Sequence, residues 1–288
     1  MDKEHVAAIG AAICITIWGL TFIFSKELMV YFTPIQLMSM RFLIAFLVLL
    51  VICPKMEFDI KKEWVYVLIA LFGNLIYYLA ENVALTYTYA SEVSILTSTT
   101  SMMSLVLMFV LFKDRIMKLQ VIGFVVSFIG VVLVTFNGTV ILNLDPIGDI
   151  LSLAAALSWA IYCVLLRLFS KDIDGRILTR KMMFYGFLMT IPLMIIDGHG
   201  FDTTHLFDAD TLVGLFFLGV LGSGLCFILW NHSVKVLGVV KSNIFIYAMP
   251  AVTLIAGRVV FDETITIMAV IGVALIIMGM LMANRDPE

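Results

Sequence analysis

Apolar residues occur along this chain in long unbroken runs that are separated by short polar or charged segments. A hydrocarbon core of about 30 Å needs roughly 20 apolar residues per helix, and in lipid the backbone must satisfy its own hydrogen bonds. The runs do not alternate residue by residue, so they predict helices. The predicted transmembrane helices cover residues 6–25, 36–53, 64–86, 92–112, 119–136, 149–168, 182–197, 211–233, 242–259 and 265–283.

The predicted fold class is therefore an all-α integral membrane protein with ten transmembrane helices. The seventh run is the weakest of the ten, because it is short and contains Pro192. Composition supports the same class, since the 288 residues are 62% hydrophobic and only 14% charged. A soluble domain is about a quarter charged and under half apolar.

Positive charges gather on one side of the predicted membrane. If the N-terminus lies inside, all but three of the 18 lysines and arginines fall in inner segments, and the exceptions are Lys26, Arg41 and Arg258. Loops rich in lysine and arginine stay in the cytoplasm. We therefore expect both termini to be cytoplasmic and the chain to be a multi-pass protein of the inner (plasma) membrane. With a net charge of −3 and no basic stripe, nucleic acid is not an expected partner.

The chain also repeats itself. Trp18 and Lys26 match Trp159 and Arg167 at a shift of 141 residues. Further along, five pairs share a shift of 149: Gly73 and Gly222, Asn82 and Asn231, Asp114 and Glu263, Gly123 and Gly272, and Gly130 and Gly279. We interpret residues 1–143 and 144–288 as two five-helix halves. An odd number of helices puts the copies in opposite orientations, and inverted repeats of this kind are typical of secondary transporters, whose substrate site lies between the repeats.

Four segments carry a family resemblance: 17-IWGLTFIFSK-26, 34-PIQLMSMRF-42, 158-SWAIYCVLLR-167 and 250-PAVTLIAGRVVFDETIT-266. In this order and doubled arrangement, they resemble the drug/metabolite transporter superfamily, of the EamA type with two repeat domains. The resemblance implies a ten-helix permease, often an exporter of amino acids, other metabolites or toxic compounds, usually without ATP. The first half departs from the family pattern at Ser101, which stands where the second half keeps Pro250.

Glu81 is the single charged side chain between Trp64 and Ser91, near the centre of the third predicted helix. A carboxylate facing lipid is costly, so we expect it to face the bundle interior or water. Helical spacing places Asn74 and Tyr78 on the same face. Burial favours the neutral carboxyl, which suits reversible proton binding. We interpret Glu81 as a group that holds a proton and a cationic part of the substrate in turn, and the alternative is a structural glutamate hydrogen-bonded between helices.

Aromatic residues are the second set of candidates. Trp230 is the repeat counterpart of Glu81, and its ring could help to hold a cation. Trp18 and Trp159 lie deeper than an interfacial belt, and Tyr162 is one turn from Trp159. We expect these four residues to line a substrate pocket, whereas the alternative for Trp230 is a lipid-facing filler.

Polar residues elsewhere have two interpretations. Ser98 and Ser101 on the fourth helix and Tyr247 on the ninth either line the cavity or bond between helices. Arg41, near an outer helix end, either extends to the headgroups or guards the outer mouth.

Several repeat pairs are expected to be structural. Asn82 and Asn231 should bond to neighbouring helices, and the negative charges of Asp114 and Glu263 should be favourable near helix N-termini. The glycines at a spacing of seven should pack the fifth helix against the tenth.

The predicted function is secondary-active export of a small metabolite, such as an amino acid, amine or toxic compound, by alternating access at a central cavity, with proton coupling through Glu81. The alternative is a permease for an anionic metabolite or a nucleoside, in which Glu81 carries only protons. An intramembrane enzyme or a non-transporting membrane protein is a more distant alternative, since no HExxH or nucleotide-binding run occurs. We expect a small-molecule substrate, the lipid bilayer and protons as partners, no cofactor or metal, and either a monomer or a homodimer.

Overall fold

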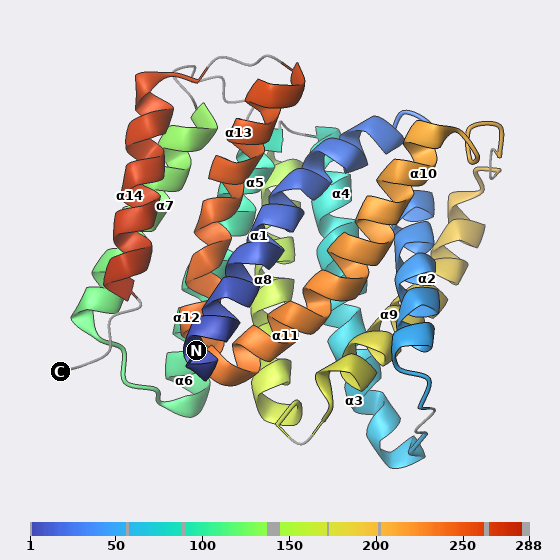
Figure 1. Ribbon diagram of the computed structural model, residues 1–288, viewed down its shortest axis with the longest axis horizontal. Helices are drawn as coiled ribbons and strands as arrows, with labels where there is room; N and C mark the ends of the chain where they lie inside the picture. Colours follow the sequence, from blue (N-terminus) through green and yellow to red (C-terminus); the bar gives the residue numbers. More distant parts are fainter. Residues whose placement is uncertain are drawn as a thin grey trace.

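The computed structural model describes residues 2–55, 58–87, 90–136, 145–171, 173–200, 203–261 and 265–283. Every regular element within these ranges is a helix, and the long helices cross the molecule side by side (Figure 1). Among the described residues, eight helical segments are long and apolar enough to span a membrane, and α14 (Ile267–Ala283) is a shorter apolar helix. The all-α membrane fold is thus confirmed.

The first five predicted runs each correspond to a helical segment. They are α1 (Lys3–Leu28); α2 (Pro34–Ile52); the continuous α3 (Ile60–Ala70), η1 (Leu71–Ile76) and α4 (Tyr77–Tyr87); α5 (Ala90–Ser98) with α6 (Thr100–Phe112); and α7 (Lys118–Phe136). Their starts follow ordinary capping rules. For example, Thr33 and Gln36 form a capping box ahead of α2, and Pro34 supplies the fixed φ of a first helical turn.

The remaining runs correspond to α8 (Pro146–Phe169); α9 (Gly175–Asp197); α10 (Ala209–Phe216), η2 (Phe217–Leu225) and α11 (Cys226–Leu237); α12 (Val239–Asn243), η3 (Ile244–Ala248) and α13 (Met249–Phe261); and α14. The seventh helix differs most from its prediction. It begins at Gly175, seven residues before the predicted start, and passes through Pro192. The sequence pattern missed its first turns because they carry Arg180 and Lys181, whose side chains are buried.

Two π-helical segments interrupt otherwise regular helices at corresponding points of the two halves. η1 covers 71–76 and η2 covers 217–225, and the shift of 149 carries the first into the second. π-Helical turns occur mostly as short insertions at functional sites. The fourth run is also broken, at Thr99 between α5 and α6, although this half has no proline there.

Glycines bring α7 and α14 into contact along their length, and the pair lies at one side of the bundle (Figure 1). A methyl group added at Gly123 would stand 2.6 Å from the carbonyl oxygen of Gly279, and one at Gly130 would stand 2.6 Å from that of Gly272. No side chain fits at that spacing, so only glycine permits this approach. The predicted packing of the fifth helix on the tenth is confirmed.

Candidate functional site

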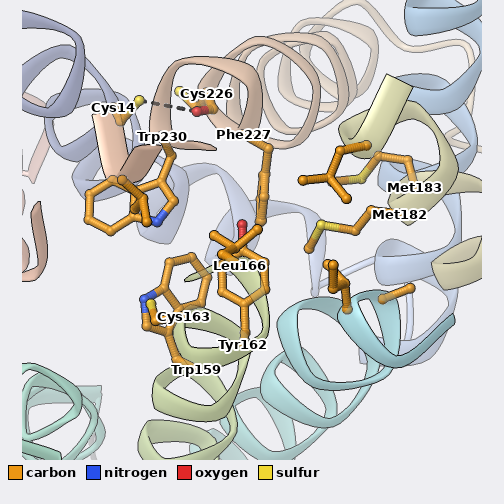
Figure 2. Close-up of a cluster of buried hydrophobic side chains, with 14 of the residues drawn as sticks. Cys14, Trp159, Tyr162, Cys163, Leu166, Met182, Met183, Cys226, Phe227 and Trp230 are labelled. Carbon is orange, nitrogen blue, oxygen red and sulfur yellow. Dashed lines mark hydrogen bonds between the residues drawn. The ribbon is translucent and has the colours of Figure 1, made fainter. Parts of the chain in front are cut away.

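Three tryptophans meet at the centre of the bundle. Trp18 of α1 lies edge-on to Trp159 of α8 at 5.4 Å between ring centroids, and Trp230 of α11 lies 5.3 Å from Trp18 and 6.0 Å from Trp159. All three are buried, with exposures of 6%, 5% and 0%. Figure 2 shows Trp159 and Trp230 side by side in this cluster. Trp230 therefore does not face lipid.

Further aromatic rings surround the tryptophans. Phe227 lies 5.4 Å from Trp18, Tyr77 lies 5.1 Å from Trp159, and Tyr162 lies 5.0 Å from Trp159. We call these six rings, including Trp230, the aromatic cluster. The faces of these rings attract a cation, and their edges and faces together can pack against a planar apolar group.

Hydrogen bonds hold part of the cluster in place. The indole Nε1 of Trp18 donates to the carbonyl of Gly222, within η2, at 2.8 Å. The hydroxyl of Tyr162 donates to Oδ1 of Asn231 at 2.6 Å, and Nδ2 of Asn231 donates to Thr179 at 3.0 Å. The prediction that Asn231 bonds to neighbouring helices is confirmed. The indole N–H groups of Trp159 and Trp230, in contrast, have no acceptor among the described residues.

Glu81 joins the cluster through Tyr77. Its carboxylate is buried, with 6% of the residue exposed, and Tyr77 lies one helical turn earlier on the same face of α4. It lies six residues before the helix ends at Tyr87, so its expected place near the helix centre is wrong. The predicted run 64–86 already places residue 81 only five residues from its end, so the position was misjudged within the run itself.

Arg41 lies in the same part of the bundle and does not extend to the headgroups. It is 5% exposed and bonds to partners inside the bundle. Its Nε donates to Ser223 at 2.9 Å, its Nη2 donates to the Tyr78 hydroxyl at 3.3 Å, and its guanidinium lies 4.4 Å from the Tyr78 ring. The Tyr78 ring in turn lies 5.1 Å from that of Tyr77, one helical turn before Glu81. A buried cation and a buried carboxylate thus occupy one site.

Other candidates lie outside this site. Asn74 is fully buried and donates to the carbonyl of Met182 on α9 at 3.1 Å. The Ser98 hydroxyl bonds back to Ile95 at 2.7 Å, and that of Ser101 bonds to the carbonyl of Asn243 at 2.7 Å. Tyr247 packs against the rings of Phe124 and Phe128. These contacts are of the kind that the structural interpretation of the polar stripes describes.

Sequence reasoning missed Phe227 and Ser223, although a signal for both was present. Adding the shift of 149 to Tyr78 gives Phe227, and adding it to Asn74 gives Ser223. The repeat counterpart of a polar candidate residue therefore also indicated a residue of the site. Asp114 also differs from its prediction, because its partner is the guanidinium of Arg167, with Nη2 to Oδ1 at 2.8 Å, instead of helix amides. Glu263 lies outside the described residues.

A buried ion pair closes the end of the bundle where α1, α3 and α9 begin. Lys181 of α9 pairs with Glu63 of α3, and their side chains are 11% and 8% exposed. Tyr185 donates to the other oxygen of Glu63 at 2.7 Å, and the Lys181 ammonium lies 4.3 Å from the Tyr66 ring. Arg180 donates to the carbonyls of Cys53 and Lys55, which ties α9 to the end of α2. We call Glu63, Lys181 and Tyr185 the polar lock.

The opposite end is closed by apolar contacts. A cluster of buried side chains joins α1 and α2 to α10 and η2: Leu28, Phe32, Leu37, Leu215 and Leu218. Gln36 adds a hydrogen bond from its side chain to the carbonyl of Gly200 at 3.2 Å. The aromatic cluster therefore lies between two closed ends of different chemistry.

Known proteins that match the chain are membrane transporters. An uncharacterized transporter of Archaeoglobus fulgidus is 24% identical over 280 residues, which cover 95% of this chain and 97% of the relative. The uncharacterized transporters YyaM and YetK of Bacillus subtilis are each 28% identical, over 92% and 97% of this chain and 89% and 87% of their own. A solved structure described only as the crystal structure of a protein has a TM-score of 0.80 at 18% identity, covers 98% of this chain and 99% of its own, and so shares the fold.

The family comparison gives two matches, one to each part of the chain. The model described as the EamA-like transporter family matches residues 5–136 and again residues 146–285. Together with the apolar helices, this makes the protein a multi-pass transporter of the inner membrane. The chain belongs to the EamA-like transporter family.

Proposed function

We propose that the protein is a secondary-active exporter of a small amine-bearing metabolite, which it moves by alternating access at the aromatic cluster. The observation that carries the proposal is the burial of Glu81 beside this cluster, one helical turn from Tyr77 on α4. A carboxylate among aromatic rings suits an ammonium group, because both the charge and the ring faces attract it.

Contacts between the halves support an inverted repeat, with residues 1–143 and 144–288 as its two copies. Gly123 contacts Gly279, and Gly130 contacts Gly272. Since the shift of 149 converts Gly123 to Gly272 and Gly130 to Gly279, the two contacts are the same contact made twice. Such exchange is the mark of a two-fold axis. The boundary at 143/144 lies outside the described residues.

A second exchanged pair lies beside the aromatic cluster. Tyr162 packs on Gly73, and Thr21 packs on Gly222. The shifts of 141 and 149 relate Thr21 to Tyr162 and Gly73 to Gly222, so this is again one contact made twice. The pseudo-two-fold axis of the proposed repeat then passes through the aromatic cluster, which is where inverted-repeat transporters bind substrate.

Alternating access requires each closed end to open in turn. In this proposal the polar lock is at the cytoplasmic end and breaks when that end opens, whereas the apolar closure around Leu28 and Leu215 separates when the other end opens. Proton coupling follows from charge. Arg41 balances the negative charge of an ionised Glu81. When Glu81 takes a proton from the outer side, its carboxylate loses that charge and releases the substrate amine.

Arg41 also favours a second candidate function. A buried guanidinium with partners at 2.9 Å and 3.3 Å could bind an anionic metabolite, and Glu81 would then carry only protons. The two candidates differ in what Glu81 contacts. In the first it contacts substrate and proton in turn, whereas in the second it never contacts substrate.

Transport by purified protein in proteoliposomes tests the proposal. We expect Glu81→Gln to abolish pH-driven uptake of amine-bearing compounds, and the matched variant Glu27→Gln, at an exposed position, to leave it intact. If Glu81→Gln loses pH-driven transport but still binds anionic compounds, the second candidate is correct. Unchanged pH-driven transport in Glu81→Gln would rule out both.

A further inference from the structure

Two indole N–H groups at the centre of the bundle lack acceptors. Trp159 and Trp230 are 5% and 0% exposed, and neither Nε1 has a hydrogen-bond partner among the described residues. Their rings lie 6.0 Å apart between centroids with 53° between the planes, side by side in Figure 2. Buried donors without an acceptor are uncommon in proteins, because the group loses its bond to water and gains nothing.

Trp18 shows that the fold can satisfy such a donor. Its Nε1 donates to the Gly222 carbonyl in η2 at 2.8 Å. The corresponding bond from Trp159 would end at Gly73 in η1, but Trp159 does not make it. The Ser158 hydroxyl takes the adjacent Phe72 carbonyl at 2.7 Å, and Tyr162 packs directly on Gly73. At this repeat position, the indole N–H of Trp18 therefore has an acceptor, whereas the indole N–H of Trp159 has none among the described residues.

Tyr77 connects these donors to Glu81. Its ring lies 5.1 Å from Trp159, and Glu81 follows it by one helical turn on the same face of α4. A small molecule that places its amine at Glu81 can therefore reach the two indoles across the face of Tyr77. Such a molecule would have to present a hydrogen-bond acceptor at that point to satisfy them.

We propose that the indole N–H groups of Trp159 and Trp230 are the donors that hold an oxygen atom of the substrate. This inference rests on the proposed function and deepens it: the substrate carries a carboxylate or carbonyl oxygen beside its amine. Glu81 selects the amine, and the two tryptophans reject an amine that lacks the oxygen, because the donors would then stay unpaired.

Thermal shifts of the purified full-length protein test this with three matched sets of ligands. The sets are leucine, leucinamide and isoamylamine; phenylalanine, phenylalaninamide and phenethylamine; and lysine, lysinamide and cadaverine. In at least one set we expect the members with a carbonyl or carboxylate to bind about tenfold more tightly than the plain amine, the ratio that one charge-assisted hydrogen bond gives. A comparison of each amino acid with its amide shows whether the indole donors bind a carboxylate oxygen or a carbonyl oxygen.

Phenylalanine variants separate the donor from the ring. Trp159→Phe and Trp230→Phe should remove the preference for the oxygen, whereas Trp64→Phe, at a position 51% exposed, should keep it. Ultraviolet resonance Raman spectra of the indole N–H band should shift on addition of the oxygen-bearing ligand. Equal binding within every set, no binding by any of the nine compounds, or an unchanged preference in both variants would overturn the proposal.

The proposed function can fail separately. If Glu81→Gln leaves amine binding intact but both tryptophan variants lose the oxygen preference, the indole donors are confirmed and the role of Glu81 is wrong. If Glu81→Gln abolishes binding and the indole band never moves, the role of Glu81 stands and the inference about the indoles fails.

Discussion

Trp18 and Trp159 occupy the same position in the two halves of the chain, and their rings meet edge to face at 5.4 Å. Two equivalent residues can touch only if they lie next to the axis that relates the halves. Their environments nevertheless differ, since Trp18 donates to Gly222 and Trp159 has no acceptor among the described residues. In the proposed inverted repeat, the axis would therefore pass through a place where the two copies have diverged, as expected where one asymmetric substrate must bind.

This difference predicts unequal stability effects. Trp18→Phe removes the hydrogen bond to the Gly222 carbonyl, a loss of about 0.5–1.5 kcal/mol beyond the change in packing. Trp159→Phe loses no hydrogen bond within the described structure, so in the absence of ligand it should unfold closer to the wild type. Thermal unfolding in detergent compares the two, and a larger loss in Trp159→Phe would contradict the assignment.

The α7–α14 contact should tolerate no side chain larger than hydrogen. Gly130→Ala places a methyl group 2.6 Å from the Gly272 carbonyl, and the helices must separate at a cost of about 1–3 kcal/mol. Gly175→Ala is the matched control, because a methyl group there meets no atom within 4 Å. Thermal unfolding of both variants checks the prediction, which would be wrong if they were equally stable.

Helix positions and close helix packing could be predicted from this sequence, because apolar length and glycine spacing are local properties. The partners of polar residues could not. Arg41 was placed at a helix end, yet its partners Ser223 and Tyr78 lie on other helices, 182 and 37 residues away. Ser101 was grouped with the cavity because it is polar, whereas its hydroxyl satisfies the carbonyl of Asn243. Sequence shows which face of a helix is polar, but the neighbours decide whether that polarity is available to a ligand.

Orientation is testable at two exposed positions. Lys62 precedes the polar lock and has a side chain that is 70% exposed, whereas Thr203 is exposed beside the opposite end. The excess of lysine and arginine places Lys62 in the cytoplasm. In intact cells, an impermeant maleimide should therefore label Thr203→Cys and not Lys62→Cys, and inside-out vesicles should give the reverse. Labelling of both from one side would overturn the topology.

Arg41 and Glu81 should be coupled in stability. Arg41→Gln removes a buried cation from the part of the bundle that holds Glu81, together with its hydrogen bonds to Ser223 and Tyr78, a loss of about 1–3 kcal/mol. Removing both charges, in Arg41→Gln with Glu81→Gln, should recover part of that loss although both variants lose transport. A double-mutant cycle on thermal unfolding measures the coupling, and strictly additive effects would show that Arg41 acts only through Ser223 and Tyr78.

The polar lock should control access from its end of the bundle. Glu63→Gln leaves the Lys181 ammonium buried without a partner charge, so the closed state loses about 3–5 kcal/mol relative to an open state in which Lys181 reaches water. Cys53 reports the opening, because it is 7% exposed and its carbonyl accepts a hydrogen bond from Arg180, the residue before Lys181. Maleimide should label Cys53 faster in Glu63→Gln than in the wild type. The exchanged pair Glu63→Lys with Lys181→Glu should slow labelling again, since it restores opposite charges. If the single variant labels no faster, the pair stabilises the fold without gating it.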